Sequence, residues 1–478
     1  MEPVRSGLRV LAACAGWFAA TLCAAQSLPE KAAPFEALYR EAYERRLRES
    51  GPEHRDTIAS LVRLGALLRA HGRAESAEPL LRKALETQGA SSSVGPDATA
   101  ELAKTLAVLG RNTEAEDLFR RSLELTQSGA QSARILLGIA RLREDYGNAS
   151  GARQAYLEAL EHFDEGAPLQ ADARRSRATA LNDLGLLLEA QGELDEAEEA
   201  YRSSAEVHAE EFGNGHPATA AVRANLASTL AMRGEAHQAS ALLQQSLAVI
   251  RAAFGSDHDE AARLHNRLGE IFEVLGRMED AEAEYLAALA AWQEPSLARG
   301  LALADLGRLA GVQGDSAAAE AALAEAIRLL EPAGDAAAVD LAEALDSYGS
   351  VLRASGRLDE AEPILAKALS IRERELGASH PDVALSLVGM AGVLHLRGDL
   401  AGAGPLYRRA LGIQEEALAP DHPDVGETLY NLAHLQRALG DIAGARYAFE
   451  RSAEILSAAY GPDDPFVVEI RAALQALP

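Results

Sequence analysis

The sequence predicts an all-α solenoid of about ten tandem helix-turn-helix repeats, and three observations lead to that prediction. The apolar residues are mostly small, with aromatics making up 5% of the chain against 48% hydrophobic residues, which suits closely packed helices better than β-sheets. Glycines recur at nearly constant spacing, and alanines recur at a fixed distance from them. The length of 478 residues also exceeds that of one compact core, so two or more domains or a repeat array is expected.

Ten glycines mark the repeats. Each follows one apolar-periodic stretch and precedes another, as expected of a glycine that ends a helix in the left-handed conformation. We therefore expect a helix A before each glycine and a helix B after it. The glycines are Gly72, Gly110, Gly147, Gly192, Gly234, Gly276, Gly314, Gly356, Gly398 and Gly440, separated by 38, 37, 45, 42, 42, 38, 42, 42 and 42 residues.

Small and large residues stand at fixed offsets from these glycines. The fifth residue after the glycine is alanine in all ten repeats, the seventh before it is Gly or Ala, and the twelfth after it is Ala or Ser. Large residues occupy the eighth position before and the ninth after. Small residues allow two helices to approach closely beside a bulky side chain. One hairpin cannot bury its apolar face alone, so neighbouring hairpins must stack on it.

This order of residues resembles the tetratricopeptide repeat, and the 42-residue spacing resembles the kinesin light chain variety of it. The turn typical of that variety reads Gly377-Ala-Ser-His380-Pro381-Asp382 and again Asp421-His422-Pro423-Asp424, with looser copies at His216-Pro217 and Asp464-Pro465. The resemblance covers roughly residues 35 to 477. It implies a right-handed superhelical solenoid, closed by half-repeat caps, that binds protein partners on its concave face.

The ends of the chain predict four segments. Residues 1–25 read as a signal peptide, residues 26–50 as an N-terminal capping helix, residues 51–462 as the repeats, and residues 463–478 as a C-terminal capping helix with Val468 and Leu474 facing inward. Arg5 and Arg9 precede an apolar run that ends in small residues, so we expect cleavage after Ala25 and export, in a bacterial cell to the periplasm.

Two alternatives for this N-terminal segment stay open. Leu11-Ala-Ala-Cys14 resembles a lipidation motif, and the apolar run could serve as an uncleaved anchor. Membrane association is expected only in those two cases. Cys14 and Cys23 are the only cysteines, so cleavage after Ala25 leaves a chain whose stability rests on packing.

The charge and the motifs exclude several classes of function. A formal net charge of −26 argues against nucleic acid as a partner, because phosphates are bound by Lys and Arg. The sequence has no nucleophile elbow, HExxH, Gly-rich phosphate loop or CxxC pair, and we expect no enzyme activity, small-molecule substrate, cofactor or metal. We interpret His216, His380 and His422 as turn residues, and the carboxylates of Glu196, Glu198, Glu199, Glu282 and Glu284 as a solvated outer face.

The resemblance implies that helix A lines the inner groove, through residues thirteen, ten, nine, six and three before the turn glycine. Asparagine amides at these positions suit a peptide backbone. Arginines there either bind carboxylates of a partner or pair with Glu270, Asp305 and Asp346 of the array itself. The candidate binding residues are Asn182, Asn225, Arg263, Asn266, Arg267, Glu270, Arg308, Tyr430, Asn431 and Arg437.

Two functions remain in view. The first is a non-catalytic scaffold that binds an extended peptide or a partner protein along its concave groove. The second is an accessory or regulatory subunit of an exported or envelope enzyme complex, bound through the outer surface. A polar, asparagine-lined groove favours the first function, whereas a large exposed apolar patch favours the second.

Overall fold

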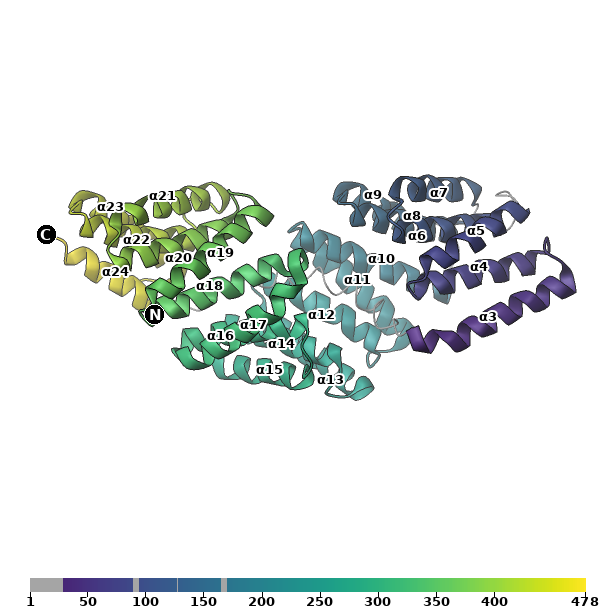
Figure 1. The fold of residues 1–478 in the computed structure, drawn as a ribbon, viewed down its shortest axis with the longest axis horizontal. Helices are drawn as coiled ribbons and strands as arrows, with labels where there is room; N and C mark the ends of the chain where they lie inside the picture. The colour runs from purple at the N-terminus through teal and green to yellow at the C-terminus, as the bar shows by residue number, and fades with distance from the viewer. Residues whose placement is uncertain (1–28, 89–93, 127, 165–169) are drawn as a thin grey trace. The chain divides into compact units, whose positions relative to one another are not determined.

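The computed structural model describes residues 29–478, apart from 89–93, 127 and 165–169, and its side chains from Glu36 onward. Every regular element in these ranges is a helix (Figure 1), which confirms the all-α prediction. The expected signal peptide lies outside the described residues. No helix among those described is both long enough and apolar enough to span a bilayer.

The described chain divides into two compact units, and the division falls between Ala253 and Phe254. The N-terminal unit begins with the single helix α3 (Pro29–Ser50). Five hairpins follow it: α4 (Arg55–Ala70) with α5 (Ala74–Gln88), α6 (Gly95–Val108) with α7 (Asn112–Leu125), α8 (Gly129–Asp145) with α9 (Ala149–Asp164), α10 (Ala171–Ala190) with α11 (Leu194–Phe212), and α12 (Pro217–Met232) with α13 (Ala236–Phe254).

The C-terminal unit also contains five hairpins and ends with the single helix α24 (Pro465–Gln475). A short 3-10 helix, η2 (Glu331–Ala337), interrupts the array between its second and third hairpins. The hairpins are α14 (Asp259–Val274) with α15 (Met278–Ala291), α16 (Leu297–Gln313) with α17 (Ser316–Leu330), α18 (Ala338–Ala354) with α19 (Leu358–Leu376), α20 (Pro381–Arg397) with α21 (Leu400–Ala417), and α22 (Pro423–Ala438) with α23 (Ile442–Tyr460).

The ten turn glycines adopt the conformation that the sequence predicts. Their φ angles lie between 71° and 88°, a region that costs a residue with a Cβ about 1–2 kcal/mol. Each glycine therefore ends helix A and reverses the chain into helix B. The turns between helix A and helix B that the glycine spacing predicts are confirmed.

The two helices of a hairpin approach closely at the predicted small residues. All ten alanines five residues after the turn glycine have a relative exposure of 0%. At Gly269 on α14, an added Cβ would lie 2.5 Å from Cε1 of Tyr285 on α15, well inside van der Waals contact. The tyrosine hydroxyl donates to Oε1 of Glu273 at 2.6 Å. The ring of Tyr285 is thus the bulky side chain that fills the space beside the glycine.

Three of the four serines twelve residues after the turn glycine tie helix B to its own helix A, whereas Ser246 bonds to a carbonyl of helix B itself. The three hydroxyls are buried and donate to carbonyl oxygens of helix A, so they add a hydrogen bond where alanine only packs. The donors Ser122, Ser204 and Ser452 reach the carbonyls of Pro96, Ala178 and Gly426, each at 2.7 Å.

Histidines cap helix A at the turns between hairpins. In each case Nδ1 accepts a hydrogen bond, at 3.1–3.2 Å, from the backbone N–H two residues on. The predicted turn role of His216, His380 and His422 is confirmed, and its physical form is an N-cap. His54 and His258 do the same without a following proline, and the His-Pro pattern therefore missed them.

The residue three positions before each of these caps also has positive φ. It is glycine at positions 51, 213, 255 and 377, and again at 461 before the Asp464 cap. At position 419 it is alanine, with φ of 84°. Among the described residues Ala419 is the one residue other than glycine with positive φ, and a Cβ is strained there.

The two single helices close the described array at its ends. On α3, the backbone carbonyl of Arg46 accepts a hydrogen bond at 3.2 Å from the hydroxyl of Thr57 on α4. On α24, Val467 and Ile470 are buried against the last hairpin and Leu474 is partly buried. Val468 is 52% exposed, so the prediction that it faces inward was wrong. The buried face of this helix begins one residue earlier than its apolar pattern suggested.

Candidate binding surface

We use the name helix A face for the residues thirteen, ten, nine, six and three before each turn glycine, where the candidate residues lie. In the N-terminal unit two of them bind each other. Asn225 on α12 is buried, and its Nδ2 donates to Oδ1 of Asn182 on α10 at 3.0 Å. These two amides therefore join neighbouring repeats, and part of their hydrogen-bonding capacity is used within the chain.

In the C-terminal unit, Asn266 and Arg308 are also engaged. Asn266 Nδ2 donates to Glu270 Oε1 at 2.9 Å and to Asp305 Oδ2 at 3.1 Å. Arg308 donates to both carboxylate oxygens of Glu273, at 2.7 and 2.8 Å, which is the strong bidentate geometry. For Arg308, then, the structure has the second of the two alternatives, pairing within the array.

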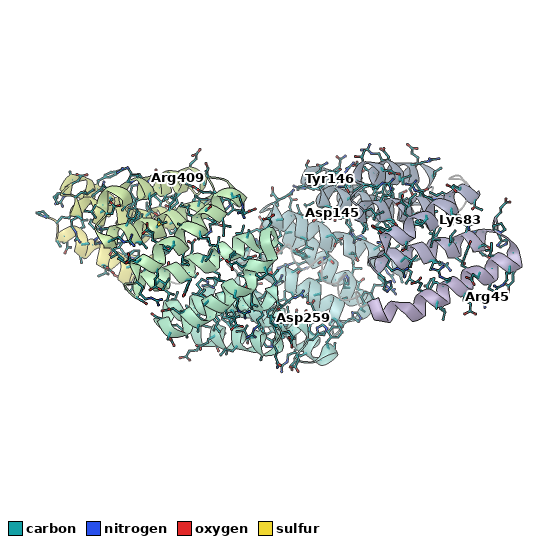
Figure 2. All side chains as sticks on the ribbon, in the orientation of Figure 1. Arg45, Lys83, Asp145, Tyr146, Asp259 and Arg409 are labelled. Atoms are coloured by element: carbon teal, nitrogen blue, oxygen red, sulfur yellow. The ribbon has the colours of Figure 1, made fainter. Side chains whose placement is uncertain are left out.

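The other two candidate arginines sit on α14. Arg263 lies 3.5 Å from a carboxylate oxygen of Asp259 and from one of Glu260, both on its own helix. Asp259, labelled in Figure 2, also accepts a 2.8 Å hydrogen bond from the indole of Trp292. Arg267 is buried beside Glu270, whose pKa its charge lowers. Neither arginine stands alone on the surface.

The contacts Asn182–Asn225 and Asn266–Asp305 belong to a series that we call the polar ladder, because each member links helices A of neighbouring repeats. The residue nine before one turn glycine meets a residue three, six or ten before the preceding turn glycine. Sequence reasoning found the asparagines but missed these ion pairs, although each joins complementary charges on two neighbouring helices A. The ladder comprises Arg69–Glu101 at 3.2 Å, Arg141–Asp183 at 2.7 Å, Asn182–Asn225 and Asn266–Asp305.

Carboxyl groups gather on α14, α16 and α18, and all of them except Asp340 lie on the helix A face. We call them the acidic cluster. Glu270 is 2% exposed, and its burial, with Asp305 nearby, raises the pKa of its carboxyl to about 8. Burial likewise raises the pKa of Asp305 to about 7. The members of the acidic cluster are Glu270, Glu273, Asp305, Asp340, Glu343 and Asp346.

The α18 part of the acidic cluster is nearer the surface. Asp346 accepts hydrogen bonds from Arg372 and from Ser386, the latter at 2.7 Å, yet burial still raises its pKa to about 6. Burial and the neighbouring Glu343 raise the pKa of Asp340 to about 6. Glu343 itself is half-buried. Among the described residues it has no hydrogen-bond or ion-pair partner.

The last three candidates form a separate group on α22. Tyr430 donates to Glu469 Oε1 on α24 at 2.8 Å, and its ring centroid lies 5.0 Å from that of Phe466. Arg437 is exposed and donates to His434 Nδ1 at 3.1 Å. Asn431 donates to a carbonyl of its own helix. The group offers an aromatic surface beside one accessible cation.

The expectation of a solvated outer face on helix B was wrong for two of its glutamates. Glu198 is buried and pairs with Arg233 and with Arg202, and Glu284 lies 2.5 Å from His265 Nδ1. His265 lies on helix A of the same hairpin as Glu284, whereas Glu198 is covered because the turn of one hairpin lies against helix B of the preceding one. Arginines at these turns reach back to glutamates in Arg111–Glu78 at 2.7 Å, Arg357–Glu320 at 2.5 Å, Arg233–Glu198 and Arg397–Glu362.

Other sites are weaker candidates. A hollow in the N-terminal unit is lined by Glu116, Asp117 and Tyr146 among others, and Tyr146 is labelled in Figure 2. Its Glu116 already accepts hydrogen bonds from Tyr146 at 2.8 Å and from Arg143 at 3.0 Å. Within the ranges that the structure describes, no three or more His, Cys, Asp or Glu side chains are placed to hold a metal ion.

Family models place these repeats in a known class. One model, described as tetratricopeptide repeat, matches residues 18–88, 176–252, 224–294, 340–403 and 382–458, and a second of the same description matches 62–133. The chain therefore belongs to the tetratricopeptide repeat family. Repeats of this family generally mediate protein–protein interaction and typically form non-catalytic scaffolds, and neither matching model describes a catalytic family.

Among solved structures, the chain is similar to that described as BtubC (BKLC) from P. vanneervenii. The two sequences are 20% identical, the similarity covers 50% of this chain and 92% of that one, and the TM-score is 0.39. No protein of curated function matched the sequence.

Proposed function

We propose that this chain is a non-catalytic scaffold that binds an extended peptide or a partner protein along its helix A face. Membership in the tetratricopeptide repeat family supports this proposal. The observation that carries it is the group on α22, where Tyr430 and the exposed Arg437 are not part of the polar ladder. Aromatic and arginine side chains are the residues that contribute most to protein interfaces.

A second function is an accessory or regulatory subunit that attaches through its outer, helix B surface. Exposed apolar side chains on helices B favour it, since such residues mark interaction sites when they gather. Tyr447 on α23 is 65% exposed, and Leu157 on α9 and Leu286 on α15 are also exposed. They stand singly on separate helices, so we rank this function second.

Site-specific photocrosslinking in producing cells separates the two proposals. A photoreactive residue replaces Ser347 or Arg437 on the helix A face, and Ser370 or Arg408 on helix B serves as the matched control, all four in the C-terminal unit. Ser370 and Arg408 are exposed. Adducts at the first pair alone, identified by mass spectrometry, support the helix A face. Adducts at the second pair alone refute it and favour the outer surface.

We also propose that the chain is exported, to the periplasm in a bacterium, after cleavage following Ala25. The support is the basic, apolar and small-residue order of residues 1–25. A family match that begins at residue 18 overlaps this leader, which makes the position of the mature N-terminus worth measuring. Mass spectrometry of the cell-made protein should find Gln26 at the N-terminus, whereas a chain that retains Met1 in the cytoplasm refutes the export.

A further inference from the structure

One tyrosine beneath the helix A face lacks the acceptor that its counterparts have. Four repeats carry tyrosine nine residues after the turn glycine, and three of these four carry glutamate three residues before it. The hydroxyls of Tyr156 and Tyr285 donate to such glutamates, at 3.0 and 2.6 Å. For Tyr407 on α21 the corresponding residue is His395 on α20, whose ring lies edge-on to the tyrosine ring. This repeat therefore keeps the donor but not the carboxylate.

The Tyr407 side chain is buried, yet its hydroxyl can be reached. The residue is 2% exposed, and among the described residues its hydroxyl has no hydrogen-bond partner. This oxygen is not one of the unpartnered side-chain atoms that are sealed from solvent, so an atom of a ligand can approach it. A buried hydroxyl that makes no hydrogen bond destabilises the folded chain, and such a group in a native protein calls for an explanation.

Access to this hydroxyl is open because Gly392 on α20 has no side chain. It lies on the helix A face, six residues before the turn glycine, where the other nine repeats carry larger residues. A Cβ built on it would lie 3.7 Å from the Tyr407 hydroxyl and 3.8 Å from Nε of Arg353 on α18. We call this point the Gly392 opening. An oxygen atom that enters there can accept a hydrogen bond from the tyrosine beside the positive charge of the arginine.

The surroundings of the Gly392 opening suit an extended peptide. Gly389, three residues earlier on the same face of α20, also leaves the backbone bare, and Ser350 on α18 is small and half-buried. Bare backbone lets the main chain of a peptide come close. Leu396, one turn further along α20, is 60% exposed and offers an apolar contact. A free anion would use neither feature, whereas an acidic side chain on an extended segment, with an apolar residue beside it, uses both.

We propose that the Gly392 opening receives an aspartate or glutamate side chain of an extended partner segment, whose carboxylate accepts a hydrogen bond from the Tyr407 hydroxyl. Arg353 supplies the positive charge beside that carboxylate. The carboxylate of the partner thus takes the place that a glutamate of the chain itself has beside the tyrosines of other repeats. The inference rests on the proposed function, since it names the kind of residue that the helix A face recognises.

The test uses the full chain and two labelled peptides of equal length, which carry leucine and serine together with glutamate in one and glutamine in the other. Binding is followed by fluorescence anisotropy at physiological salt. Tyr407→Phe removes the hydroxyl, Gly392→Ala fills the opening with a methyl group, and His395→Glu supplies the missing carboxylate within the chain. Tyr285→Phe is the matched control, because that hydroxyl is already bonded to Glu273. Circular dichroism checks that all four variants stay helical.

We expect the parent chain to bind the glutamate peptide roughly tenfold more tightly than the glutamine peptide, because the hydrogen bond is made to a charged group. Tyr407→Phe and Gly392→Ala should each weaken glutamate-peptide binding roughly tenfold, whereas Tyr285→Phe should leave it within about twofold. His395→Glu should remove the preference for the glutamate peptide. It should also raise the melting temperature, since the Tyr407 hydroxyl gains an acceptor within the chain.

Equal binding of the two peptides, or binding of neither, overturns the inference. Parent-like binding by Tyr407→Phe overturns it too, as does equal weakening by Tyr407→Phe and Tyr285→Phe. If Tyr407→Phe loses its helical structure, Gly392→Ala and His395→Glu decide in its place, and parent-like binding by both overturns the inference. Crosslinking at Ser347 or Arg437 reports separately on the proposed function, so a partner captured there without a preference for the glutamate peptide refutes only the inference.

Discussion

The buried carboxyl of Glu270 makes the stability of this protein depend on pH in an unusual direction. Its pKa is raised from 4.5 to about 8 by burial and by Asp305, so the folded chain holds a proton that the unfolded chain releases at neutral pH. The substitution that tests this is Glu270→Gln. Glutamine keeps the size of the side chain and the oxygen that accepts the 2.9 Å hydrogen bond from Asn266, and it cannot ionise.

The sign and size of the effect follow from linkage. A carboxyl whose pKa is raised by folding contributes its full stability below the unfolded pKa, and that contribution falls as pH rises toward the folded pKa. The loss is at most about 1.4 kcal/mol per pH unit. Between pH 5 and pH 8 the upper limit is therefore about 4 kcal/mol, and titration of Asp305 over an overlapping range reduces it. We expect about 2 kcal/mol.

Urea unfolding of the parent and the variant at pH 5, 6, 7 and 8 measures this difference. All other groups titrate in both proteins, so the gap between the two profiles isolates Glu270. The two should be similarly stable at pH 5, and the variant should gain on the parent at each step upward. Glu416→Gln, on the exposed side of α21, should track the parent. Parallel profiles for Glu270→Gln and the parent would show that this carboxyl is ionised in the folded protein, and the reasoning would be wrong.

Three further substitutions test the packing and the turns by thermal unfolding. Gly269→Ala puts a Cβ 2.5 Å from the ring of Tyr285 and should destabilise the folded chain by about 1–3 kcal/mol. Gly392→Ala is the control: the nearest atom to its Cβ is 3.5 Å away, so it should be neutral or stabilise the chain by up to about 1 kcal/mol. Equal effects of the two substitutions would contradict the close packing of Gly269 against Tyr285. Ala419→Gly relieves a φ of 84° and should stabilise the folded chain by about 0.5–1 kcal/mol, which raises the melting temperature slightly. A lower melting temperature would argue against backbone strain at this position. His380→Ala removes the 3.2 Å hydrogen bond that caps α20 and should destabilise the chain by about 1 kcal/mol. His380→Asn should retain most of that stability, because asparagine also caps helices. An equal loss of stability in both variants would indicate that the imidazole ring acts by packing.

The sequence was sufficient for the fold because the repeat rests on backbone geometry. A glycine at positive φ and an alanine between two close helices each admit few replacements, so they recur visibly. The caps could have been found more fully. A glycine three residues before a histidine precedes helix A at His54 and His258 as well as at His216, and that pattern does not need the proline.

The candidate surface was predicted less well, since helical periodicity assigns a face but not a partner. Asn225 and Arg308 are on the expected face, yet they are engaged by Asn182 and Glu273 of neighbouring repeats. Which side chains meet across two helices depends on how those helices are offset, and spacing along one chain does not report that offset. The burial of Glu270 was missed for the same reason, because Asp305 and Arg308, two of the charged residues that act on it, belong to the next repeat.

The arginines at the turns determine where the chain can be cut into fragments without breaking ion pairs. Arg357 bonds to Glu320, 37 residues earlier, and Arg111 bonds to Glu78, 33 residues earlier. A fragment cut between two complete hairpins therefore separates a cation from its carboxylate, even though no helix is broken. In the N-terminal fragment, the glutamate on the last helix B is then exposed to solvent without its arginine. The apolar face beside it is exposed as well, because the next hairpin no longer packs on it. The transferable unit of this protein is accordingly a hairpin together with the following helix A and its turn, and fragments or grafted repeats should be cut after that turn.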